Sequence, residues 1–196
     1  MKKALTVLAL STLVSFNVFA SETEHLEHHE MEKEGSSKYY IAVKGVMTLG
    51  DSVKETEGEE VVTVDGDTGA GISLDLGYKL PYGFAVEVDV IYVQNDVTIK
   101  SEDFEDETFT ASYISTSLDL AYKYNLTHDF GLVAKVGYEY EYETIDGDST
   151  DDTGFIYAAG AEYEVGENVL LVAEYEGSTI DGPRGDAIFA GVVYEF

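Results

Sequence analysis

The sequence contains no cysteine and no tryptophan, and only 2 of its 196 residues are proline. Without cysteine the chain cannot form a disulfide framework, bind a metal through thiolates or use a cysteine nucleophile. Cationic side chains are also scarce, since 11 lysines and arginines face 39 aspartates and glutamates. A surface with that balance repels phosphate backbones, so we expect no nucleic-acid partner. Divalent cations are better suited to it.

Long apolar runs are missing, apart from a short one near the start. Two lysines precede an apolar stretch at residues 4–13, and the small residue Ala20 follows soon after. That order is typical of a secretory signal peptide, which we expect to comprise residues 1–20 and to be cleaved. No other stretch approaches the roughly 20 apolar residues that a membrane-spanning helix needs. We therefore exclude a helical membrane protein.

Apolar and polar residues alternate along the chain from residue 39 onward, and this period of two predicts β-strands. There are eight such segments, with apolar positions in residues 41–49, 70–80, 84–92, 114–124, 130–140, 155–163, 169–175 and 188–196. The intervening positions carry acids, lysines, glycines or serines. We expect one face of every strand to be apolar and the other to be charged or small.

The connections between these segments alternate in length. Short ones lie at residues 81–83, 125–129 and 166–168, and longer ones at 51–68, about 95–111, 146–153 and 181–186. Strands of about ten residues, with short turns at one end and long acidic loops at the other, are typical of outer-membrane barrels.

A soluble β-sandwich or a lipocalin-like barrel is the alternative, because alternation fixes the faces of a strand without saying what each face meets. The exported leader and the small residues on the polar face, which suit a narrow lumen, favour the membrane. So do the aromatic residues near the short turns, which match an interfacial belt. These are Tyr78, Tyr82, Phe84, Tyr122, Tyr124, Phe130, Tyr163, Tyr194 and Phe196.

The leader, the eight amphipathic strands and the C-terminal residues Gly191, Tyr194 and Phe196 together resemble the small outer-membrane barrels of the OmpA/OmpX type, known as porin-family or outer-membrane β-barrel-domain proteins. The resemblance covers residues 39–196, although Phe189 stands where a polar residue is common. It implies an all-β fold: an eight-stranded antiparallel, up-and-down transmembrane barrel with short periplasmic turns and longer extracellular loops.

The resemblance also implies a location in the outer membrane of a Gram-negative cell. There the protein would contact lipid and lipopolysaccharide and be a monomer, and the barrel-insertion machinery would read the signal formed by Gly191, Tyr194 and Phe196. Fold and location follow more strongly than activity, because such barrels serve adhesion, structural, channel and enzymatic roles.

Histidine placement argues against an enzyme. A lipid-modifying barrel of the acyl-transfer or hydrolase kind would need an imidazole near a serine and a carboxylate at the outer rim. His25, His28 and His29 precede the barrel, and His128 lies in a short turn at the opposite end. We therefore predict no catalytic residue and no cofactor, with an outer-leaflet lipid-modifying enzyme as the remote alternative.

Two clusters are candidate metal sites. His25, His28 and His29 lie in a His/Glu-rich periplasmic tail at residues 21–38, where helical spacing would bring them together. We favour a simple polar tail. Asp146, Asp148 and Asp152 resemble the start of a calcium loop, but the distal glutamate and the glycine turn are missing. We favour solvated acidic loops there, with weak divalent-cation bridging to lipopolysaccharide phosphates as an intermediate case.

The tripeptide at residues 184–186 spells an adhesion motif, Arg-Gly-Asp, which we attribute to chance in a chain so rich in glycine and aspartate. Residues 97–99 and 109–111, like 141–144, continue the strand pattern beyond the membrane. A protruding sheet with an exposed edge would be able to bind other proteins by strand pairing.

The lumen of an eight-stranded barrel is just wide enough to be filled by side chains, so we expect no open diffusion of solutes. At mid-depth we expect a charge network in which each lysine bridges more than one carboxylate. Its members are Lys44, Asp75, Asp89, Asp119, Lys135, Glu162 and Glu174. The sequence predicts a non-enzymatic barrel for envelope integrity or surface adhesion, with a narrow cation-selective or small-ligand channel as the alternative.

Overall fold

The computed structural model describes residues 38–57, 60–101 and 105–196. The expected signal peptide at 1–20 and the tail histidines His25, His28 and His29 lie outside the described residues. Within the described part of the chain, no helix is long and apolar enough to cross a membrane.

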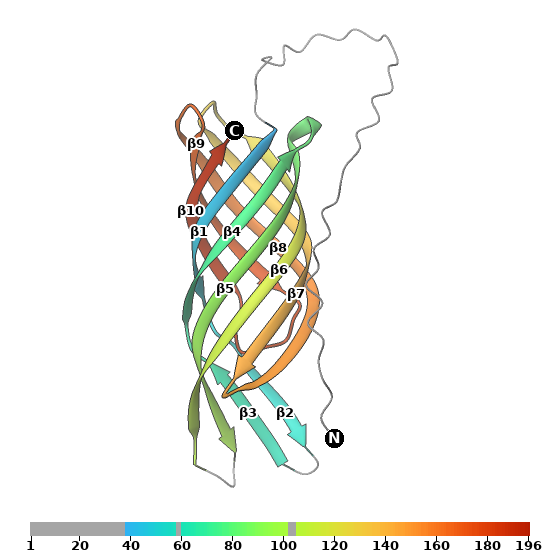
Figure 1. Cartoon of the computed structure of the whole chain (residues 1–196), viewed down its shortest axis with the longest axis vertical. Coiled ribbons are helices and arrows are strands. Elements are labelled where there is room, and N and C mark those ends of the chain that lie inside the picture. The colour runs from blue at the N-terminus through green and yellow to red at the C-terminus, as the bar shows by residue number, and fades with distance from the viewer. Residues whose placement is uncertain (1–37, 58–59, 102–104) are drawn as a thin grey trace, which may run out of the picture. The chain divides into compact units, whose positions relative to one another are not determined.

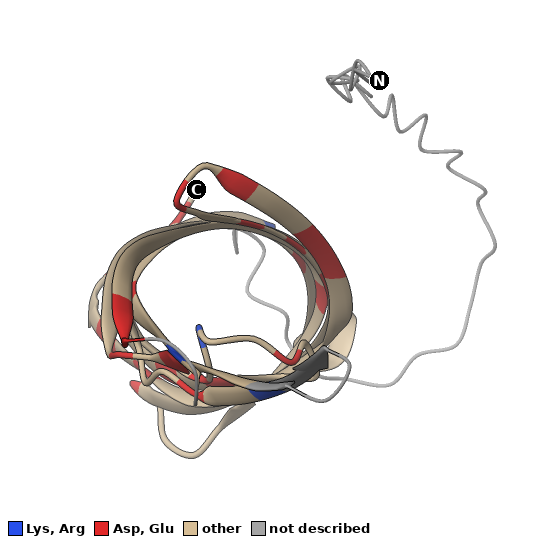
Figure 2. Cartoon of the chain, turned by 90° about the horizontal axis from the view of Figure 1, so that it is seen from below, with Lys and Arg blue, Asp and Glu red and all other residues tan. Residues whose placement is uncertain are grey.

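Eight antiparallel strands close into a barrel (Figure 1). They are β1 (Tyr39–Thr48), β4 (Gly69–Lys79), β5 (Phe84–Ser101), β6 (Glu107–Asn125), β7 (Phe130–Ile145), β8 (Asp148–Gly166), β9 (Val169–Ser178) and β10 (Ala187–Glu195). Barrel strands that follow one another in this list are also paired in the sheet. Strand β10 closes the ring by pairing with β1, with Glu195 opposite Tyr40 at one end and Ala187 opposite Thr48 at the other. The ring is visible in Figure 2, seen from the end that carries β2 and β3. The predicted all-β, eight-stranded antiparallel barrel is confirmed.

The orientation of the strand faces is the reverse of that in a water-soluble protein. Ile72 and Leu118 on the outside expose 65% and 60% of their surface, whereas Asp75 and Asp119 on the inside expose 1% and 2%. Apolar residues in such numbers on the outside need hydrocarbon around them, as in a transmembrane barrel. The alternative of a lipocalin-like barrel with its apolar faces inward is thereby excluded.

Exposed aromatic residues ring the barrel near both ends. At the short-turn end the rings of Tyr39 and Tyr78 lie 5.0 Å apart, and those of Tyr194 and Phe196 5.3 Å apart. Toward the other end Tyr138 and Phe155 make a similar edge contact at 5.3 Å. Rings with polar atoms favour the headgroup layer, so the two groups mark the two membrane interfaces. The sequence pattern indicated only the first of them.

The connections at the far end are shorter than we expected. Residues 95–111 are mostly strand, because β5 and β6 remain paired as far as Ile99 opposite Glu107. Between β7 and β8 only Asp146 and Gly147 remain, both with positive φ, of 48° and 88°. An Asp-Gly pair in this conformation makes a tight two-residue hairpin. The expectation of longer connections at about 95–111 and 146–153 was therefore wrong, whereas residues 97–99, 109–111 and 141–144 are paired strand, as their alternation indicated. The Asp-Gly pair was the signal for the tight hairpin between β7 and β8.

The connection at 51–68 contains a further hairpin, formed by β2 (Ser52–Glu57) and β3 (Glu60–Gly66). Strand β3 pairs with the outer end of β5, so that β2, β3, β5 and β6 form a sheet beyond the barrel (Figure 1). Lys100 donates to the carboxylate of Asp65 across this sheet and holds the pKa of that carboxyl below its usual range. In the sheet order β2 is an edge strand.

Candidate functional site

Two lysines and three carboxylates form the centre of the lumen. Lys44 pairs with Asp75 and has its Nζ 2.6 Å from Glu174 Oε2. Lys135 Nζ lies 2.5 Å from Glu87 Oε2 and 2.9 Å from Glu174 Oε1. The side chains of all five expose 7% or less of their surface. Each lysine contacts more than one carboxylate, and Glu174 joins the two lysines. We define these five residues as the central network.

Glu87 belongs to the central network but was missing from the expected set, although the alternation places it on the polar face. Its Oε1 accepts a hydrogen bond from the Tyr40 hydroxyl. The Tyr40 ring lies across Gly77, where an added Cβ would come within 2.0 Å of the ring. The glycine therefore makes room for the aromatic side chain that positions Glu87.

The other expected members of the network occupy different places. Asp89 and Asp119 are inside and buried, and Asp119 accepts a hydrogen bond from Ser117 Oγ at 2.9 Å. Glu162, which we expected at mid-depth, lies nearer the short-turn end, opposite the second residue of β7. Its Oε2 is 2.5 Å from Lys123 Nζ, and it is only partly buried. Alternation gives the face of a residue but not its depth.

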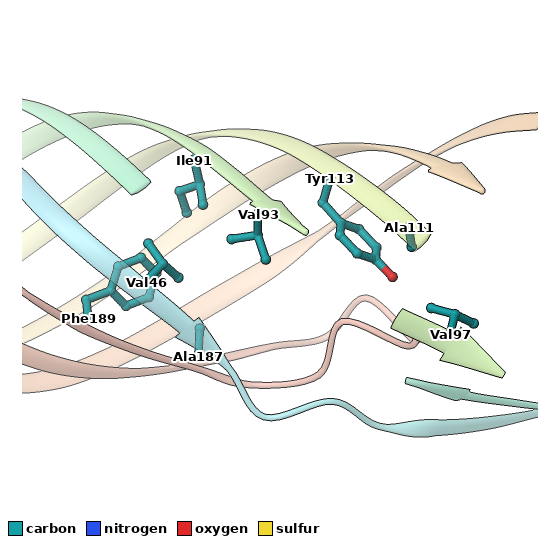
Figure 3. Close-up of a cluster of buried hydrophobic side chains, with 8 residues drawn as sticks. All are labelled: Val46, Ile91, Val93, Val97, Ala111, Tyr113, Ala187 and Phe189. Atoms are coloured by element: carbon teal, nitrogen blue, oxygen red, sulfur yellow. The ribbon is translucent and has the colours of Figure 1, made fainter. Parts of the chain in front are cut away.

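A cluster of apolar side chains fills the lumen further out (Figure 3). It comprises Val46, Ile91, Val93, Val97, Ala111, Tyr113, Ala187 and Phe189. Phe189, the departure from the family pattern, exposes 2% of its surface, and its ring centroid lies 4.9 Å from Lys44 Nζ. The expectation that inward positions are only charged or small was wrong here, because the space between eight strands has to be filled by side chains.

Arg184, the one arginine in the sequence, reaches into the lumen from the segment between β9 and β10. Its Nη1 and Nη2 each donate to one oxygen of Glu139 at 3.0 Å, and its Nε lies 2.9 Å from Glu141 Oε2. Nη1 also donates to Ser115 Oγ at 3.2 Å. A bidentate, buried pair of this kind fixes both partners. Sequence reasoning missed this role, and the signal was a single arginine in a chain with 39 acids.

The segment that carries Arg184 is itself anchored. Asn95 donates from Nδ2 to the Pro183 carbonyl at 3.1 Å, and the amides of Leu49 and Gly50 donate to the carbonyls of Asp186 and Arg184. Gly185 has a φ of 66°, and a Cβ there would come within 2.6 Å of the Gly50 carbonyl oxygen. Arg184 is thus buried and held, so residues 184–186 do not present an accessible adhesion tripeptide.

Asp146, Asp148 and Asp152 do not converge. Asp146 is in the tight turn, Asp148 pairs opposite Ile145, and Asp152 lies four residues further along the extended strand, opposite Glu141. Among the described residues, three acidic or histidine ligands come together only as His128 with Asp129 and Glu164, and as Asp75 with Glu87 and Asp89. The resemblance of 146–152 to a calcium loop therefore has no counterpart in the fold.

Little space is left around the central network. Beside the central network there is a cavity of about 10 Å³, which is at most the volume that one water molecule needs. Among the residues that the structure describes, the buried charges are unevenly balanced, with eight acids against Lys44, Lys135 and Arg184. The acids are Asp75, Glu87, Asp89, Asp119, Glu139, Glu141, Glu174 and Glu176. The lumen is both filled and strongly acidic.

Residues 6–196 match the family described as "Outer membrane protein beta-barrel domain". Among solved structures, the outer membrane protein OprG from Pseudomonas aeruginosa is similar with a TM-score of 0.67 at 16% identity, over 82% of this chain and 96% of that one. Neisserial surface protein A has a TM-score of 0.60 at 16% identity, over 83% and 100% of the two chains.

The attachment invasion locus protein Ail of Yersinia pestis, in complex with the heparin analogue sucrose octasulfate, has a TM-score of 0.51 at 18% identity, over 83% and 99% of the two chains. No curated protein matches the chain. Likeness at these identities shows the shared barrel fold alone.

Proposed function

Because the chain belongs to the outer membrane protein beta-barrel domain family and lies in the outer membrane, we propose that it is a non-enzymatic surface barrel for envelope integrity or adhesion. The filled lumen is the observation that carries this proposal. The central network closes one level of the barrel, the cluster around Phe189 fills the next, and Arg184 is bound to Glu139 near the outer end. A solute would have to displace buried ion pairs to pass.

The sheet beyond the barrel supports an adhesive role. Strand β2 has one paired neighbour, β3, so its other edge offers backbone groups for pairing with another chain. Ail, which is named for attachment, was crystallised with a polyanion, sucrose octasulfate. The present chain carries a net charge of -28, so its partner would have to be neutral or cationic instead.

Catalysis has no support among the described residues of the outer end. His128 is at the short-turn end, where its side chain is 80% exposed and its Nδ1 lies 2.9 Å from Asp129. A lipid-modifying reaction of the acyl-transfer kind would need an imidazole beside a serine at the other end. We propose that the protein acts by binding and by its place in the membrane, as a monomer surrounded by lipid and lipopolysaccharide.

We expect the purified wild-type protein to give no discrete conductance steps in planar lipid bilayers, because the remaining cavity beside the central network holds at most one water molecule. The channel alternative rests on the excess of buried acids over bases, which would favour cations. It predicts cation-selective steps in the wild type that change when Lys44 and Lys135 are replaced by methionine. Such steps, recorded from protein whose heat-modifiable migration on gels shows that it is folded, would contradict the proposal.

We expect replacement of Phe196 by leucine to reduce assembly in cells several-fold and to leave refolding into detergent almost unchanged. Phe196 exposes 65% of its surface and its ring meets that of Tyr194 edge-on, so leucine removes little packing within the protein, and the amide of residue 196 still donates to the Tyr39 carbonyl in the variant. A matched control is Phe155→Leu, at an outward position that is also 65% exposed. The heat-modifiable fraction in outer-membrane preparations measures assembly. Equal losses in both variants would contradict recognition of Phe196 by the insertion machinery.

A further inference from the structure

A cavity of about 410 Å³ opens at the end of the barrel that carries β2 and β3. We call it the mouth pocket. Its acidic lining residues are Glu141, Glu143, Asp148, Asp151, Asp152 and Asp181. Its apolar lining residues are Val53, Val64, Ile145, Ile180 and Pro183. A cavity of this size lies in the range of small-molecule sites, which are about 300–1,000 Å³.

Three segments far apart in the sequence build the mouth pocket. The β2–β3 hairpin supplies Val53 and Val64, the β7–β8 hairpin supplies most of the carboxylates, and the segment before Arg184 supplies residues 180–183. Arg184 lies next to the mouth pocket, because its Nε is 2.9 Å from Glu141 Oε2 and Glu141 is one of the lining residues.

The charge of the mouth pocket is predominantly negative. Six of its lining residues are acids, of which Glu141 is already paired with Arg184, and none is a lysine, arginine or histidine. Complementarity therefore requires a cationic ligand. A bare metal ion does not fit, because no three of these carboxylates lie within 4.8 Å of one another among the described residues. Their charge is spread over the walls and interrupted by apolar side chains.

We propose that the mouth pocket binds a linear polyamine, in which ammonium groups are separated by methylene chains. Each ammonium group would pair with a carboxylate of the β7–β8 hairpin or with Asp181, and the methylene groups would lie against Val64, Ile145 and Ile180. A polyamine carries its charge at several points along a chain, whereas a metal ion carries it at one point, and the carboxylates of the mouth pocket do not converge on one point. The inference stands apart from the envelope role, since binding at the mouth requires no transport.

Isothermal titration of spermidine into the full mature chain, folded in nanodiscs of neutral lipid, tests the proposal. We expect one saturable site per chain, with affinity that falls as salt is raised because the lining groups are partly exposed. Replacing three wall carboxylates together, Asp151→Asn, Asp152→Asn and Asp181→Asn, should weaken binding by about tenfold or more.

The matched control removes the same charge from the β5–β6 hairpin outside the pocket, by Glu105→Gln, Asp106→Asn and Glu107→Gln. It should keep the wild-type affinity within about twofold. Equal weakening in both triple variants would overturn the proposal in favour of diffuse surface charge. Absence of saturable binding by the wild type would also overturn it. Displacement of spermidine by magnesium at the same concentration of positive charge would overturn the proposal as well, because it would indicate a divalent-cation site.

Discussion

Replacing Lys135 with methionine is expected to destabilise the folded barrel by about 3–5 kcal/mol, the usual cost of removing one partner from a buried ion-pair set. The Lys135 ammonium group lies within 2.9 Å of both Glu87 and Glu174, and all three side chains are buried. Methionine fills a similar volume but leaves the two carboxylates facing each other with only Lys44 to balance them. Urea-induced unfolding in one detergent, followed by tyrosine fluorescence and gel migration, measures the difference.

Lys100→Met is the matched control for this prediction. It makes the same chemical change in a lysine whose side chain is 48% exposed and pairs with a single partly exposed carboxylate, that of Asp65. Water replaces that partner readily, so we expect no resolvable change in the free energy of unfolding. Equal stability of wild type, Lys135→Met and Lys100→Met would show that the central network does not hold the barrel together.

Replacing Arg184 with methionine is expected to cost about as much, again about 3–5 kcal/mol, because Glu139 and Glu141 then stay buried without their cation. Glu139 is fully buried and is held by both terminal nitrogens of the guanidinium group. The segment at 179–186 also loses its inward anchor, so we expect protease cleavage there to become faster. Unfolding titrations and limited proteolysis of the intact protein in detergent provide the two measurements.

A double-mutant cycle with Glu139→Gln separates the ion pair from other effects of the Arg184 change. Removing both charges should restore part of the stability lost in Arg184→Met, because an unpaired buried carboxylate is then replaced by a neutral group. If the two losses simply add, the pair has no net coupling. In that case Arg184 would stabilise the barrel through Glu141, Ser115 and the space that it fills, and not through Glu139.

Local patterns in the sequence were sufficient to predict those features of the fold that depend only on residues close together in the chain. The period of two identified the face of every barrel strand, including outward Ile72 and inward Asp75. The Asp146-Gly147 pair also contained the information for a tight hairpin, but the acidic residues around it suggested a loop instead. The polar residues around this pair stay in β7 and β8, because the two strands remain paired as far as Ile145 opposite Asp148.

The sequence by itself therefore determined the fold, the outer-membrane location and the division between lipid-facing and lumen-facing side chains. Only the tertiary structure decided which lumen residues meet. Lys44 and Glu174 are 130 residues apart, and Arg184 and Glu139 are 45 apart, yet both pairs are in contact. Contacts across a barrel depend on strand tilt and register around the whole ring, which no local period records. For the same reason the sequence alone did not predict the depth of Glu162, the cluster around Phe189 or the mouth pocket.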